Sequence, residues 1–90
     1  MKLRLIPQRA DLSVSYAAND AVLTVDVDGI EDTFDFTGVG DGELSDFSSD
    51  VLPVCPIISA MIDAGQITIR AFEYYGAGDQ PDAGEREVTI

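Results

Sequence analysis

Apolar and polar residues alternate through three consecutive runs in the first half of the chain. The runs are residues 12–16, 22–28 and 31–36, and turn-forming residues separate them. A period of two places alternate side chains on opposite faces of a strand. The pattern therefore predicts a three-stranded antiparallel meander with one apolar face. The side chains expected to form this face are Leu12, Val14, Tyr16, Leu23, Val25, Val27, Phe34 and Phe36.

The turns of the meander have sequence features of their own. Residues 17–20 read Ala-Ala-Asn-Asp, and Asn and Asp tolerate left-handed backbone angles, so the first turn is expected there. The dipeptide Asp28-Gly29 favours a type I′ hairpin, because both central residues of that turn need positive φ.

Residues 2–6 predict a further, half-exposed strand, with Leu3 and Leu5 on one side and Lys2 and Arg4 on the other. Pro7 has no amide hydrogen and is expected to end this strand. Lys2 and Arg4 of this strand would either discourage pairing with another copy or pair with carboxylates on a neighbouring strand.

The second half of the chain predicts three more extended segments and a connecting stretch. Residues 57–63 are apolar on both faces, which fits a buried strand or a short helix, and their length and β-branching favour the strand. Residues 66–75 have high β-propensity, and residues 85–90 alternate again. Residues 52–56 are expected to be extended, because a residue that precedes proline avoids helical angles.

Two stretches, 37–50 and 76–84, lack periodicity and are rich in glycine and acids. They are expected to be flexible loops, the first with one helical turn near residues 43–47. The total is six or seven short strands in a single domain, 1–90. The predicted class is all-β and mainly antiparallel: a small sandwich or partly open barrel built on the N-terminal meander.

Charge is distributed unevenly along the chain. The formal net charge is −12, from 17 acids, 5 bases and no histidine, and no base lies between Arg9 and Arg70. Such a middle repels phosphate, so nucleic acid is not an expected partner. It suits a cation, a basic protein surface, or solvent alone.

The acids of the central hairpin are the candidate for a binding surface. Asp26 and Asp28 stand two residues apart and share a face, and Thr33 and Asp35 are expected to lie opposite them.

Asp26-Val27-Asp28-Gly29 also begins like a Ca²⁺-binding loop. Ile30, however, stands where the third oxygen ligand is needed, and Thr37 stands where Glu closes such a loop. No metal ligand is therefore assigned, and a weak Ca²⁺-binding module is kept as the last alternative.

Catalytic chemistry is not predicted. Cys55, the single cysteine, lies among Pro53, Val54, Pro56 and Ile57, and the chain has no histidine to activate it, so it is expected to be a small buried hydrophobe. One cysteine cannot form an internal disulfide, which fits a cytosolic product. The candidate carboxylates fall at outward positions or in loops, whereas a general acid–base pair needs one of them buried. No catalytic or cofactor-binding residue is assigned, and no apolar run is long enough to predict a membrane span.

Aromatic residues cluster near the end of the predicted strand 66–75. Tyr74 and Tyr75, with Phe72 nearby, are a candidate interface anchor, because aromatic side chains are enriched in the centres of interfaces. The alternative is a core strand with one exposed ring.

Several short motifs together resemble small prophage proteins encoded within the tail gene clusters of tailed bacteriophages. The opening residues 1–10, Met-Lys-Leu-Arg-Leu-Ile-Pro-Gln-Arg-Ala, are similar, as are Leu12-Ser13-Val14-Ser15, Asp28-Gly29 and Phe34-Asp35-Phe36. Leu52-Pro53 and the spacing of Gly65, Ile67 and Ile69 fall in similar places, whereas the tryptophan that relatives carry near residues 55–58 is missing here. The resemblance implies a phage or prophage product made in a bacterial cytoplasm, with association with the virion left open.

Three functional hypotheses follow. The first is a non-enzymatic structural or assembly accessory that acts by protein–protein contact, with phage tail or assembly proteins as partners. The second is an acidic decoy that mimics nucleic acid and binds a basic host or phage protein. The third is a small enzyme or a metal-binding protein, the latter being the weak Ca²⁺-binding module, and the missing histidine and incomplete Ca²⁺ loop argue against both. An open edge strand in so small a sheet also predicts a homo-oligomer.

Overall fold

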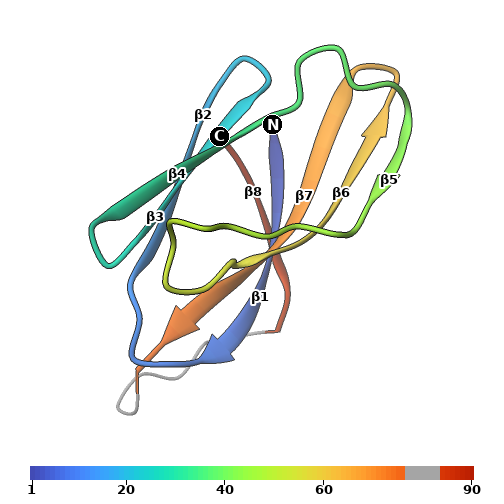
Figure 1. Cartoon of the computed structure of the whole chain (residues 1–90). Helices are drawn as coiled ribbons and strands as arrows, with labels where there is room; N and C mark the ends of the chain where they lie inside the picture. The colour runs from blue at the N-terminus through green and yellow to red at the C-terminus, as the bar shows by residue number, and fades with distance from the viewer. Residues whose placement is uncertain (77–83) are drawn as a thin grey trace.

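The protein is built from two β-sheets that share one hydrophobic core (Figure 1). The structure is a computed structural model that describes residues 1–76 and 84–90. These residues form eight strands and no helix, which confirms the all-β class. The five-stranded sheet has the order β5 (Gly42–Leu44), β6 (Ile57–Asp63), β7 (Gln66–Tyr75), β1 (Lys2–Arg9) and β8 (Arg86–Thr89). The three-stranded sheet has the order β2 (Val14–Asn19), β3 (Val22–Val27) and β4 (Ile30–Asp35).

The predicted meander is confirmed as the three-stranded sheet, with both of its pairings antiparallel. Asp28 and Gly29 have φ values of 53° and 86°, the two positive angles that a type I′ turn requires. The first turn, however, lies at Asp20 and Ala21 and not at 17–20. The alternation continues through the two alanines, because so small a side chain fits either face of the sheet.

Strand β1 does not end at Pro7, as the sequence suggested, but continues to Arg9. Met1 exchanges two hydrogen bonds with Ile90 beyond the end of β8, so the odd-numbered residues of β1 direct their N–H groups toward β8. The pairing with β8 stops at Leu5. Pro7 therefore lacks its N–H on the side where no described strand pairs with it, and the ladder to β7 is intact.

The parallel pairing of β1 with β7 was not anticipated. Lys2 pairs with Thr68, and the register runs without interruption to Arg9 and Tyr75. The other five pairings between the described strands are antiparallel. The five-stranded sheet is thus mixed, with β1 between β7 and β8.

The stretch from 37 to 56 contains a short strand, β5, where a helical turn was expected near 43–47. Residues 42–44 extend the free edge of β6 instead of forming a turn of their own. Further along, the ring of Phe47 packs against those of Phe34 and Phe36, at centroid distances of 6.1 and 6.0 Å. The loop expected at 76–84 lies outside the described residues except at its two ends.

The core lies between the two sheets. Of the eight side chains predicted to face inward, Leu23, Val25, Val27 and Phe36 are buried and the other four are partly buried against the same cluster. The five-stranded sheet supplies Leu3, Leu5, Ile57, Ala60, Ile62, Ile69 and Ala71. Residues 57–63 form a strand, as favoured, with an irregularity between Ile57 and Ser59.

Candidate interaction surface

The three acids proposed as a binding surface each accept a hydrogen bond from a backbone amide. Asp26 Oδ1 accepts from the N–H of Gly29 at 2.9 Å, and Asp28 Oδ1 accepts from the N–H of Ser13 at 2.8 Å. Asp35 Oδ1 accepts from the N–H of Thr37 at 2.8 Å, and hydrogen bonds from Thr37 hold the pKa of Asp35 below its usual value. These carboxylates stabilise the chain where it leaves the strands.

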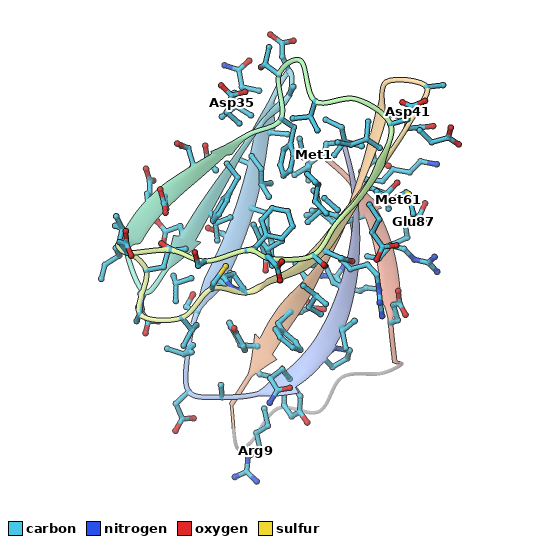
Figure 2. All side chains as sticks on the ribbon, turned by 45° about the vertical axis from the view of Figure 1, so that its right-hand side comes forward. Met1, Arg9, Asp35, Asp41, Met61 and Glu87 are labelled. Carbon is cyan, nitrogen blue, oxygen red and sulfur yellow. The ribbon has the colours of Figure 1, made fainter. Side chains whose placement is uncertain are left out.

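The structure does not bring the three acids together. The two-residue turn pairs Val27 with Ile30, so Asp26 lies opposite Glu31 and Asp35 lies opposite Val22. The expected placement of Thr33 and Asp35 opposite Asp26 and Asp28 is therefore wrong, because a turn centred on Asp28 and Gly29 puts Thr33 opposite Thr24. At about 3.3 Å per residue, Asp35 stands roughly 20 Å from the turn. Figure 2 shows Asp35 at one end of the molecule and Arg9 at the other.

A fourth acid, Asp32, faces the interior side of the three-stranded sheet and was missed from the sequence. It pairs with the buried Val25 and is itself half-buried. Ser49 Oγ donates to Asp32 Oδ2 at 2.7 Å and accepts from the N–H groups of Val51 and Leu52, at 3.2 and 3.0 Å. This cluster fastens the segment after β5 to the edge strand β4. The alternation that put Phe34 inward also puts Asp32 inward, and that was the available signal.

Tyr74 and Tyr75 are adjacent in β7, so their rings lie on opposite faces of the sheet. Tyr74 stacks on Phe72 with a centroid distance of 6.1 Å and an interplanar angle of 25°. Burial raises the pKa of Tyr74, with a smaller contribution from Cys55. Tyr75 contributes its carbonyl, which accepts from the N–H of Ala10 at 3.1 Å. Both rings are half-buried.

A different tyrosine, Tyr16, joins the two sheets. Its hydroxyl donates to the carbonyl of Phe72 at 2.6 Å. The N–H of Phe72 donates to the carbonyl of Pro56 at 2.9 Å, but a proline has no N–H to return the bond. The tyrosine hydroxyl takes the place of that missing donor. Burial, and then nearby Tyr74, Cys55 and Glu73, raise the pKa of Tyr16 well above its usual value.

The basic residues are paired on the five-stranded sheet. Arg86 forms two bonds with Glu73, at 2.6 and 2.8 Å, which lower the pKa of Glu73. Glu85 lies 3.1 Å from Arg4 and 4.0 Å from Arg70. Lys2 lies 3.9 Å from Glu87. Three acids thus pair with four of the five bases, so the charges of this group nearly cancel.

The acids in the middle of the chain have no basic residue near them in sequence. Twelve acids lie between Arg9 and Arg70, with no base among them. They include every acid of the three-stranded sheet and of the segment from 37 to 56. The charge is therefore segregated: the five-stranded sheet is nearly balanced by its ion pairs, and the three-stranded sheet is uniformly acidic.

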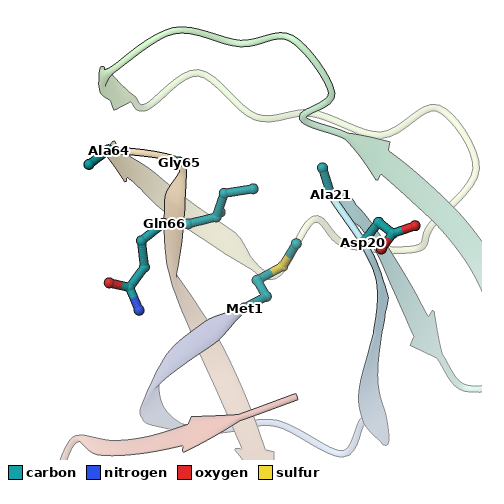
Figure 3. Close-up of a pocket in the computed structure, with 7 residues that line it drawn as sticks. Met1, Asp20, Ala21, Ala64, Gly65 and Gln66 are labelled. Carbon is teal, nitrogen blue, oxygen red and sulfur yellow. The ribbon is translucent and has the colours of Figure 1, made fainter.

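The described residues line two hollows between the sheets. One, of about 480 Å³, opens between the β2–β3 and β6–β7 turns, with Met1 between them (Figure 3). The other, of about 210 Å³, lies between β2 and β8 and is called the β2–β8 groove below. It is lined by Leu3, Leu5, Val14, Ser15, Tyr16, Glu73, Arg86, Val88 and Ile90.

Residues 1–76 and 84–90 contain no cluster of three or more His, Cys, Asp or Glu side chains placed to hold a metal ion. Nor do those residues include a helix of the length and apolarity needed to cross a membrane. Cys55 is a free, half-buried thiol.

Comparison with known proteins gives no relative: no family model, no curated protein and no solved structure matches the chain.

Proposed function

We propose that the protein is a non-enzymatic module that acts by protein–protein contact, and that its partner presents a basic surface. The observation that carries the proposal is the segregation of charge between the two sheets. An acidic sheet without bases attracts a positively charged protein over distances of the order of the Debye length, about 8–10 Å at physiological salt. The resemblance to prophage tail-cluster proteins supports a role as a structural or assembly accessory of a phage tail module in a bacterial cytoplasm.

We also interpret the two sheets as a small sandwich that is closed on one side and open on the other. On the β4 side, the Asp32–Ser49 bond and the rings of Phe34, Phe36 and Phe47 fasten the connecting segment across the gap. On the other side, β2 and β8 face each other across the β2–β8 groove.

The test is co-purification of the tagged protein from bacterial cells in which the prophage is induced. Capture of tail or assembly proteins, reduced when Asp26 and Glu31 are both changed to lysine, supports the proposal. The matched control changes the exposed Glu43 and Asp63 of the five-stranded sheet to lysine, which alters the net charge equally, and is expected to leave capture intact. Failure to capture any protein at low salt contradicts the proposal.

The decoy hypothesis rests on the same acidic sheet and differs in the partner. A decoy is displaced by DNA, because both occupy one basic site, and its capture targets are DNA-binding proteins. Adding duplex DNA to the captured complex separates the two hypotheses. Release of the partner supports the decoy, and retention supports the assembly accessory.

A further inference from the structure

The four outer strands of the two sheets differ in how well they are protected against pairing with another chain. Strand β4 carries Glu31, Asp32 and Asp35, and β8 carries Arg86 and Glu87. Strand β5 is only three residues long. Charged side chains and short length are the usual means by which an edge strand avoids pairing. Strand β2 has neither: its six residues, Val-Ser-Tyr-Ala-Ala-Asn, include no charge and no proline.

Within residues 1–76 and 84–90, no strand pairs with the outer edge of β2, and the register with β3 gives the positions of its outward hydrogen-bonding groups. The N–H of Asp28 donates to the carbonyl of Ser13. In an antiparallel ladder the bonded residues alternate, so Ser15, Ala17 and Asn19 bond to β3 as well. The N–H and C=O groups of Val14, Tyr16 and Ala18 therefore point away from β3, along the open side of the sheet.

The side chains on either side of this edge select what can pair with it. Toward the interior, an added strand would meet the β2–β8 groove, whose lining includes Leu3, Leu5 and Val88. Toward the outside, it would lie beside Ser15 and Ala17, which are small and exposed. Asp26 is directly across from Ser15, and Glu31 is directly across from Asp26. A long basic side chain on the added strand can thus lie over Ser15 and reach the carboxylate of Asp26.

We propose that the β2 edge is a strand-addition site for an extended segment of a partner protein that alternates apolar and basic residues. The apolar residues enter the β2–β8 groove, and the basic residues face the acidic outer side of the three-stranded sheet. The main chain of the segment bonds to Val14, Tyr16 and Ala18. This inference rests on the proposed function and specifies where the partner binds and what it presents.

Charge argues for such a segment and against a second copy of this chain. Each copy carries a formal charge of −12, so joining two copies at β2 would bring two acidic sheets into one continuous sheet. A basic segment lowers the local charge instead. The preferred partner strand is therefore one of opposite charge.

The test uses two nine-residue peptides of equal composition, capped at both ends. One alternates five lysines with four valines, and the other places the lysines and the valines in separate blocks. The alternating peptide is expected to bind at least ten times more tightly than the block peptide. Binding should slow amide hydrogen exchange at Val14, Tyr16 and Ala18 and leave Glu31 and Thr33, on the opposite edge, unchanged.

A pair of proline variants tests the same edge from the protein side. Ala18→Pro removes an outward N–H without removing a bond to β3, and is expected to weaken the alternating peptide at least tenfold. The matched control is Thr33→Pro on the edge of β4, where the amide donates only to the neighbouring Asp32 carboxylate, and it should bind the peptide as the native protein does. Exchange in the native protein keeps the test valid if Ala18→Pro fails to fold.

Three outcomes overturn the strand-addition site. The first is equal affinity of the protein for the two peptides. The second is slowed amide exchange only at residues outside β2 when the peptide binds. The third is slow exchange of the β2 amides without peptide, in a protein whose mass in solution is that of a dimer. The last would show that a second copy occupies the edge. Co-purification with Ala18→Pro separates this inference from the proposed function. If the variant captures the same proteins as the native chain, contact function stands and the β2 site is wrong; if the native chain captures nothing, the function itself fails.

Discussion

The hydroxyl of Tyr16 is expected to be a principal polar link between the two sheets, and Tyr16→Phe removes it while keeping the ring. The bond to the Phe72 carbonyl is 2.6 Å long and partly buried. Pro56, which lies opposite Phe72, has no N–H to donate to the Phe72 carbonyl. In the variant, that carbonyl therefore loses the tyrosine hydroxyl as its donor and gains no substitute from Pro56. Loss of a hydrogen bond that leaves a buried partner unsatisfied costs about 1–3 kcal/mol.

For a domain of this size, 1 kcal/mol corresponds to about 4–8 °C in Tm, so Tyr16→Phe should lower Tm by roughly 5–20 °C. Circular dichroism at the β-sheet band during heating measures the shift, and urea unfolding gives the free energy independently. Tyr75→Phe is the control, because the Tyr75 hydroxyl makes no hydrogen bond within the described residues. If both variants melt within about 2 °C of the native protein, the bridging role of Tyr16 is refuted.

Three further predictions follow from the described contacts. Ser49→Ala should destabilise the fold by about 1–2 kcal/mol and speed amide exchange at Leu52, since its hydroxyl donates to Asp32 and caps two amides. Ser48→Ala should do neither, and equal effects in urea unfolding and exchange would contradict the role given to Ser49. Gly29→Ala should cost about 1–2 kcal/mol, because φ is +86° there, whereas Gly40→Ala, in open space without positive φ, should be neutral or stabilising by up to about 1 kcal/mol. The pKa of Tyr16 is raised in the folded state, so its contribution to the free energy of unfolding is complete below the unfolded pKa of about 10. As the pH rises above that value, this contribution falls by up to about 1.4 kcal/mol per pH unit. Urea midpoints between pH 8 and 11 should fall less steeply in Tyr16→Phe than in the native protein, and identical slopes would exclude this coupling.

Local patterns were enough to predict the three-stranded sheet. Alternation fixed which side chains face inward, and Asp28-Gly29 fixed the turn, because both depend only on neighbours in sequence. The same rules predicted β6 and β7 at their observed bounds. The register of the acids was predicted wrongly, although the Asp28-Gly29 turn already implies it: with Val27 paired to Ile30, Asp26 lies opposite Glu31 and Asp35 lies opposite Val22.

The partners of β1 could not be predicted in this way. A strand with alternating leucines looks the same whether its neighbour is parallel or antiparallel, and the neighbour here is far away in sequence. Whether Pro7 ends a strand likewise depends on which side its missing N–H faces, and that is set by the extent of β8. The sequence showed a middle stretch with acids and no bases, but only the structure showed that Glu73, Glu85 and Glu87 pair with the bases and leave the three-stranded sheet as the acidic one.

The parallel pairing of β1 with β7 has a consequence for how the protein is made. Lys2 and its partner Thr68 are 66 residues apart, so the centre of the five-stranded sheet cannot form until most of the chain has left the ribosome. Long-range pairing of this kind is slow, because the entropy of closing the loop is lost before the contact forms. The three-stranded sheet needs only neighbours and can form first. Leu3 and Leu5 would then remain exposed to solvent until β7 has been synthesised. During this interval the protein is most prone to aggregate and to bind chaperones.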